Sequence, residues 1–185
     1  MTEITNATLM ELAIPGRSCG SCTLCCKVFP VPWVDNKPAG VWCKHCTPGK
    51  GCGIWQTRPQ GCIDFLCQYF FIKDIGEEWR PDKAKFLLNY EKETWLVVHA
   101  DVKMPDAWKR EPYGSQIRKW ADGQMAIGKG VMLYVGAKKF IVTPDSEIPI
   151  HDYPGAKFQL AKTINNGKPT YNVNIIPAEN NILNG

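Results

Sequence analysis

The stretch Cys19-Gly20-Ser21-Cys22-Thr23-Leu24-Cys25-Cys26 opens a segment that contains every cysteine of this 185-residue chain. Two more cysteines follow in Cys43-Lys44-His45-Cys46, and the last three are Cys52, Cys62 and Cys67. A Cys-x-x-Cys turn can direct two sulfurs at one ion, about 2.3 Å from each. Thiols that are this concentrated predict metal ligation, and all nine cysteines are candidate ligands.

Disulfide bonds are the competing use of these thiols, and they require export to an oxidising compartment. Residues 1–14 lack the basic start and the apolar run of a signal peptide, and they contain Glu3 and Glu11. Nine is also an odd number, which leaves one thiol unpaired in any disulfide framework. We therefore expect a cytoplasmic protein with reduced thiols that ligate an iron–sulfur cluster or zinc.

The adjacent pair Cys25 and Cys26 indicates more than one centre. Neighbouring side chains diverge by about 100° in a helix and about 180° in a strand, so these two sulfurs are expected to serve different sites. A helix over residues 18–27 would place Cys19, Cys22 and Cys26 on one stripe. Nine thiols are enough for two four-coordinate sites with one to spare.

The cysteine pattern resembles the YkgJ-type cysteine-cluster family, which is described as a zinc- or iron-chelating domain. The resemblance lies in the run Cys19-x-x-Cys22-x-x-Cys25-Cys26 and in the segment from Gly51-Cys52-Gly53-Ile54 through Arg58-Pro59 and Cys62 to Cys67. Trp55 stands where the family usually has Tyr. Cys46 occupies a position that is usually apolar in the family, so the resemblance implies that Cys46 is the spare thiol.

Every thiol can be explained as a ligand, and no substrate-pocket residues are evident in the sequence. We therefore expect a metal-binding protein, either non-catalytic or accessory, that presents a rigid surface to a protein partner or carries a metal. The alternative is an iron–sulfur-dependent redox or protein-modifying enzyme, by analogy with flagellin lysine N-methylases, to which one branch of the family is similar. The sequence contains neither a radical-enzyme Cys-x-x-x-Cys-x-x-Cys loop nor a glycine-rich nucleotide-binding motif. An enzymatic role therefore rests on analogy.

The identity of the metal stays open between two choices, because all-thiolate ligation suits both. The even spacing of Cys19, Cys22 and Cys25 is similar to the ferredoxin run, and on this ground we prefer an iron–sulfur cluster. Zinc is favoured by the separation of Cys19-x-x-Cys22 from Cys43-x-x-Cys46, which is close to that of a zinc ribbon. That pairing depends on Cys46.

Composition and charge limit the remaining classes. A formal net charge of +4 with 22% charged residues is too small a basic excess to predict nucleic-acid binding. The apolar stretches are only a few residues long, so no membrane association is expected. The segments are predicted to be an N-terminal arm (1–17), a cysteine-cluster metal-binding module (18–72) and a small α+β domain (73–185).

The third segment shows the alternating pattern of strands and one helical period. Residues 86–88 and 95–99 predict a β-hairpin, as do residues 131–135 and 139–143 around a Gly136 turn. Tyr113, Ile117 and Trp120 recur at helical spacing, which predicts a helix over residues 112–122 that ends before Gly123. A last strand pair is expected around Asn166-Gly167. The predicted fold is α+β, with a small metal-stapled module packed on an antiparallel-sheet domain with one main helix.

Residues other than cysteine give weaker indications of function. Trp33 and Trp42 are expected in ordinary core packing, or alternatively in an apolar shell around the sulfurs. Arg58 is expected either to offset thiolate charge or to be solvated at a helix start. His99 and Asp101 lie on one face of an extended chain, and we expect a strand-end histidine and a turn aspartate rather than a catalytic pair.

Overall fold

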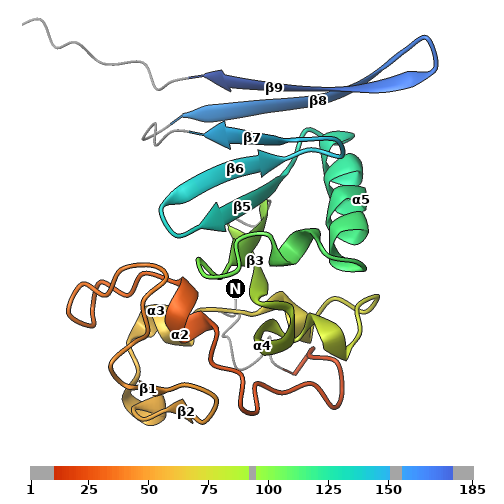
Figure 1. The fold of residues 1–185 in the computed structure, drawn as a ribbon. Coiled ribbons are helices and arrows are strands. Elements are labelled where there is room, and N and C mark those ends of the chain that lie inside the picture. The colour runs from red at the N-terminus through yellow and green to blue at the C-terminus, as the bar shows by residue number, and fades with distance from the viewer. Residues whose placement is uncertain (1–10, 92–94, 151–155, 177–185) are drawn as a thin grey trace, which may run out of the picture.

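The computed structural model describes residues 11–91, 95–150 and 156–176, and its centre is a five-stranded sheet in the order β3-β4-β5-β6-β7 (Figure 1). The strands are β3 (Phe86–Glu91), β4 (Trp95–Ala100), β5 (Val131–Val135), β6 (Lys138–Val142) and β7 (Glu147–Ile150). Residues 1–10 of the predicted arm and residues 92–94 of the first hairpin lie outside the described residues. Both helices and sheets are present, which confirms the α+β class.

Both hairpins of the sheet are confirmed. Strand β3 pairs antiparallel with β4, and β5 pairs antiparallel with β6 across the two-residue loop Gly136-Ala137. Gly136 has a φ of +61°, a left-handed conformation that glycine adopts without steric cost. The sequence does not predict the edge strand β7, because Pro149 interrupts its apolar pattern.

The prediction of an antiparallel sheet is wrong at its centre. Strand β4 pairs with β5 in parallel, from Leu96 opposite Val131 to Ala100 opposite Val135. A parallel pair needs a crossover connection, here residues 101–130, which contain η4 (Ala107–Lys109) and α5 (Tyr113–Met125). The sheet is therefore mixed, and the crossover carries the main helix across one of its faces.

The main helix is confirmed, although α5 runs to Met125 and so includes Gly123. A Cβ added at Gly123 would meet no atom within 4 Å, so this glycine lies at an open position where nothing forces a helix end. Met125 is only 1% exposed and packs into the apolar core beyond the predicted end. Tertiary burial of this last turn outweighs the modest preference of glycine against a helix interior.

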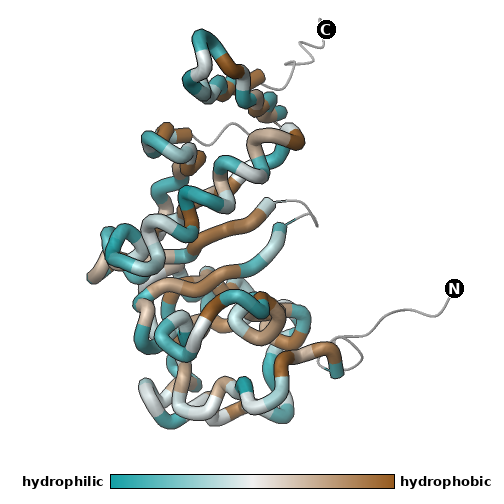
Figure 2. The backbone as a smooth tube through the Cα atoms, turned by 90° about the vertical axis from the view of Figure 1, so that its right-hand side faces the viewer, coloured by the Kyte–Doolittle hydropathy of each residue, from teal (hydrophilic) through white to brown (hydrophobic). Residues whose placement is uncertain are grey.

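The larger core lies between α5 and one face of the sheet. Ile117 and Ala121 of α5 are fully buried against strand residues such as Val98 and Val131. The segment that follows the last cysteine joins this core through η2 (Gln68–Phe70), η3 (Glu77–Trp79) and α4 (Pro81–Ala84). Figure 2 shows the apolar stretches gathered in the central strands, with hydrophilic segments around them. Alternating side chains of the same strands point to the opposite face.

Two separate parts of the chain cover the opposite face. A ribbon of β8 (Lys157–Asn165) and β9 (Lys168–Ile176) confirms the last predicted strand pair, and its Leu160 packs with Val97 and Ile141. At the other end of this face, Leu24 and Val28 of the cysteine segment pack on Leu87. The ribbon and the cysteine segment lie at opposite ends of the molecule (Figure 1).

The cysteine segment itself has little regular structure. It contains the helical turns α2 (Cys25–Val28), η1 (Trp55–Thr57) and α3 (Gln60–Ile63), and a short hairpin of β1 (Cys46–Thr47) and β2 (Gly51–Cys52). Among the described residues, no helix is both long enough and apolar enough to cross a membrane.

His99 lies where the cysteine segment meets the sheet. Its buried environment predicts that the stability of the fold depends on pH. Its Nε2 is 2.7 Å from Asn89 Oδ1, and its ring packs 4.4 Å from that of Phe29. Burial lowers the pKa of His99 from 6.5 to about 3, so the folded state favours the neutral ring. The stability from the neutral ring is complete above pH 6.5 and falls as pH drops toward 3.

We expect the protein to lose about 2 kcal/mol of unfolding free energy through His99 between pH 7 and pH 5. Denaturant unfolding of the wild-type protein and of a His99→Gln variant at both pH values measures this loss, because glutamine does not titrate. The variant should show a correspondingly smaller decrease. Equal decreases in the two proteins would mean that His99 binds its proton in the folded state.

Candidate metal centre

The first four cysteines do not lie on one helix. Helix α2 begins only at Cys25, while the preceding residues form a turn in which the N–H of Cys22 donates to the carbonyl of Cys19 at 2.7 Å. The stripe expected from a helix over residues 18–27 is therefore absent, because Gly20 adopts a φ of +49° within that turn. Desolvation and then Cys22 raise the pKa of Cys19, and Cys26 adds to this effect, so Cys19 remains near Cys26 although the two do not share one helix.

The β1–β2 hairpin brings later cysteines together with Cys26. Cys46 lies directly opposite Cys52, so their side chains are cross-strand neighbours. The N–H of Cys46 donates to the carbonyl of Cys43, and the N–H of Cys43 donates to the carbonyl of Cys26, both at 3.0 Å. One backbone hydrogen bond thus joins Cys43 to Cys26, which lies 17 residues earlier in the chain. The Cys43-x-x-Cys46 sequence therefore forms a tight turn that lies beside α2.

Cys62 completes this assembly from α3. Desolvation raises its pKa, and the neighbouring sulfurs of Cys26, Cys43 and Cys52 raise it further because thiolates repel one another. The pKa of Cys46 rises to about 12, first through desolvation and then through Cys26. Hydrogen bonding to Cys25 is the main cause of the raised pKa of Cys26, so the adjacent pair is in contact. Five thiols are thus neighbours of one another, and we name them the second sulfur group: Cys26, Cys43, Cys46, Cys52 and Cys62.

Cys19, Cys22 and Cys67 form what we name the first sulfur group. Cys67 is buried at the start of η2, and burial raises its pKa to about 12, with smaller contributions from Cys22 and Cys19. Desolvation also raises the pKa of Cys22, and the nearby carboxylate of Asp82 adds to this effect. Asp82 belongs to α4, so the first group is built where the cysteine segment meets the sheet domain.

The two groups are not ready-made sites. Within residues 11–91, 95–150 and 156–176, no three or more Cys, His, Asp or Glu side chains are arranged to hold a metal ion as they stand. All nine cysteines are free thiols, so none is consumed in a disulfide bond. Ligation would require side-chain rotation that brings the sulfurs together, as is usual where metal binding is coupled to folding.

Two cations lie beside the sulfurs. Lys37 is buried, and its Nζ donates to the carbonyls of Lys27, Phe29 and Pro38. Burial lowers the pKa of Lys37, whereas Cys43 and Cys26 oppose that shift. Arg58 stacks on the ring of Trp55 at 3.9 Å and lowers the pKa of both Cys19 and Cys62. Among the described residues, the Nε of Arg58 has no hydrogen-bond partner. Its effect on the two thiols agrees with a role in offsetting thiolate charge.

Other expectations for this segment need correction. Trp33 is 69% exposed and Trp42 is 37% exposed, so neither is packed in a core. The Trp33 ring lies over Gly61, where an added Cβ would be 2.5 Å from a ring carbon. The apolar residues of the segment are too few to enclose these large rings, so the rings stay on the surface.

Sequence reasoning missed the ion pair between Lys27 and Asp101. The Lys27 Nζ lies 2.7 Å and 2.5 Å from the two carboxylate oxygens of Asp101, and both side chains are more than nine-tenths buried. The sequence predicts only a turn aspartate at position 101. The sequence contains no local signal for a pair that is 74 residues apart. The ion pair between Lys27 and Asp101 anchors the cysteine segment to the end of β4.

Searches of known protein families, curated proteins and solved structures found no match to this chain. The resemblance to the YkgJ-type family therefore stays a prediction from the motif.

Proposed function

We propose that residues 19–67 bind metal through cysteine thiolates and that the protein is a non-catalytic or accessory metal-binding protein. The observation that supports this proposal is the gathering of thiols from distant parts of the segment. Cys67 joins Cys19 and Cys22, while Cys62 and Cys52 join Cys26. An iron–sulfur cluster is preferred over zinc.

The chemistry of the donor set fits such a metal. Soft thiolates are the ligands preferred by zinc and by iron–sulfur clusters. In the free protein, desolvation and mutual repulsion raise the pKa of several of these thiols, so few of them can ionise together. A cation removes that penalty by compensating the negative charge. A bound cluster would supply electron transfer, whereas zinc would supply a rigid crosslink.

We assign four of the five thiols of the second sulfur group to a closed four-thiolate centre. Cys46 lies across the hairpin from Cys52 and interacts with Cys26, so its position favours it as a ligand rather than as the spare thiol implied by the family pattern. Cys25 is the better candidate for the spare thiol. It packs against the apolar cluster of Leu24, Val28 and Leu87. This proposal differs from the assignment of Cys46 as the spare thiol, which the resemblance to the family implies.

The first sulfur group favours the second candidate function, an iron–sulfur-dependent redox or protein-modifying enzyme. It contains three thiols, with Asp82 and Arg80 as charged neighbours of Cys22 and Arg58 as a charged neighbour of Cys19. Three protein thiolates leave one position of a four-coordinate centre for Asp82 or for an exogenous ligand. A catalytic centre must keep such a position free or exchange a ligand reversibly. This group is therefore where activity would arise.

Anaerobic purification followed by metal and sulfide analysis tests the proposal. We expect a protein with bound iron and acid-labile sulfide, or with stoichiometric zinc. The same analysis of two serine variants tests the ligand assignment, with Cys46→Ser expected to lose metal and Cys25→Ser expected to retain it. The two substitutions are matched in chemistry and lie in the same segment. Protein without any metal would overturn the proposed function, and retention of metal by Cys46→Ser would restore the spare-thiol assignment.

A further inference from the structure

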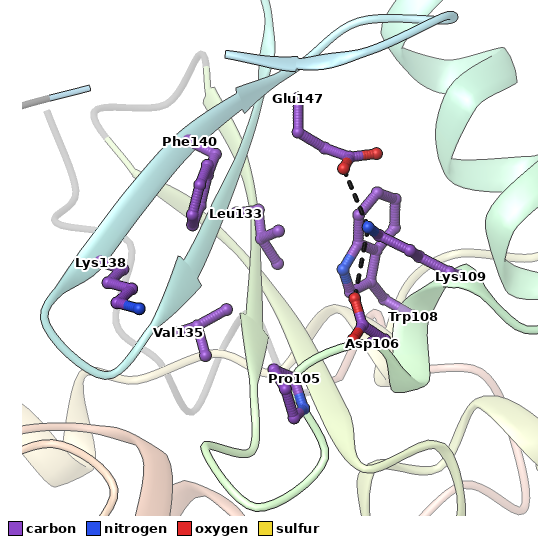
Figure 3. Close-up of a pocket in the computed structure, with 9 residues that line it drawn as sticks. All are labelled: Pro105, Asp106, Trp108, Lys109, Leu133, Val135, Lys138, Phe140 and Glu147. Atoms are coloured by element: carbon purple, nitrogen blue, oxygen red, sulfur yellow. Dashed lines mark hydrogen bonds and ion pairs between the residues drawn. The ribbon is translucent and has the colours of Figure 1, made fainter. Parts of the chain in front are cut away.

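A small pocket on the sheet domain lies apart from the cysteines. It has a volume of about 230 Å³ and is lined by residues of η4, β5 and β6, with Glu147 of β7 at its edge. Leu133, Val135 and Phe140 form the apolar wall opposite the indole ring of Trp108 (Figure 3). Lys109, Asp106 and Lys138 supply the polar part of the lining. The pocket thus combines apolar walls with a few polar groups, which is the usual composition of a ligand site.

Trp108 carries an unsatisfied hydrogen-bond donor in this pocket. The side chain is fully buried, and among the described residues its Nε1 has no hydrogen-bond partner. Figure 3 shows the indole nitrogen on the edge of the ring that faces Leu133. Buried N–H groups of native proteins almost always donate to an acceptor, and indole nitrogen can only donate. An acceptor oxygen within the pocket would satisfy this group.

Among the described residues, one cation that lines the pocket has no carboxylate to pair with. Lys109 pairs with Glu147 at 2.9 Å and with Asp106 at 3.2 Å, and Glu147 also pairs with Arg118. Both carboxylates of the lining are therefore neutralised within the protein. Lys138 has no ion-pair partner within the described ranges, and it lies on the side of the pocket opposite Lys109 (Figure 3). The free charge at the pocket is positive.

We infer that this pocket binds a small aromatic carboxylate. The ring of the ligand would lie between Trp108 and Phe140, where its apolar area is removed from water. Its carboxylate would accept the Trp108 N–H and face the ammonium of Lys138, since charge-assisted hydrogen bonds are the stronger ones. The volume suits one ring with a short polar group rather than a nucleotide. This site is independent of the proposed metal centres.

Titration of the 15N-labelled full-length protein with benzoate tests the inference. The Trp108 indole N–H resonance, assigned by its absence in Trp108→Phe, should shift saturably with benzoate. Benzylamine is the matched control, because it keeps the ring but carries a positive charge and no acceptor. It should leave the resonance unchanged.

Two variants connect the shift to the pocket. Val135→Phe fills the pocket and should abolish binding, whereas Ile127→Phe changes an exposed residue outside it and should not. Lys138→Gln should weaken benzoate binding about tenfold, the effect of losing one charge-assisted contact. The matched control Lys157→Gln should have no effect, as Lys157 is exposed on β8. Equal shifts with benzoate and benzylamine, no shift with either, or a shift that survives Val135→Phe would overturn the inference.

Discussion

Removal of the metal is expected to unfold residues 19–67 while the five-stranded sheet stays folded. The regular structure of this segment consists of single helical turns and one hairpin of two-residue strands. Its own apolar clusters contain few buried residues, such as Leu24 and Val28 in one and Val31 and Val34 in the other. Structural zinc contributes about 10–16 kcal/mol of apparent binding free energy in small domains, far more than these clusters can supply.

Tryptic cleavage of chelator-treated protein measures this unfolding at a defined bond. Lys27 is 5% exposed within α2, so the bond that follows it should be protected in the metal-bound protein and cut quickly in the apo protein. The bond after Arg118, in the middle of α5, should be protected in both states and serves as the internal control. Mass spectrometry identifies the fragments. If the Lys27 bond stays protected in protein shown to be metal-free, the metal does not hold this segment.

Asp101→Asn is expected to destabilise the protein by about 3–5 kcal/mol, because it leaves the ammonium of Lys27 buried without a counter-charge. Asparagine keeps the shape of the side chain and an oxygen that can accept the N–H of Lys103, now bound at 2.9 Å. The loss therefore isolates the charge of Asp101. Denaturant unfolding of the metal-bound protein measures it.

Two comparisons make this prediction specific. The double variant Lys27→Met, Asp101→Asn removes both charges and should regain most of the lost stability, which gives a double-mutant cycle for the pair. Asp35→Ala removes the carboxylate from the exposed pair with Lys44 and should have no measurable effect. A small loss in Asp101→Asn, similar to that in Asp35→Ala, would show that water reaches the Lys27–Asp101 pair.

Local patterns were sufficient for the helix and the three hairpins of the second part of the chain. The loops Gly136-Ala137 and Asn166-Gly167 join strands through two residues, and the positive φ values of Gly136, Asn166 and Gly167 are those that such residues favour. The i, i+4 spacing of Tyr113 and Ile117 likewise placed α5. These features depend on interactions between near neighbours, so they can be recognised from the sequence.

The cysteine pattern also determined, by itself, which segment carries the candidate metal chemistry. It did not determine which thiols become neighbours. Cys67 joins Cys19 and Cys22 because η2 packs into the main core, and Cys52 meets Cys46 through the register of a hairpin. Spacing along the chain is a poor guide to such contacts when turns rather than one helix separate the residues.

The sequence alone determined the classes of local structure and the segment that contains the thiols. Periodicity and turn preferences depend on residues that are near one another in the chain, so they can be recognised without the structure. Only the tertiary structure decided the parallel pairing of β4 with β5, the burial of Lys27 against Asp101 and the pocket at Trp108. Each of these brings together residues from separate elements, and their free energy comes from burial and long-range pairing. Such contacts carry no local sequence signal, since either partner alone resembles an ordinary surface or core residue.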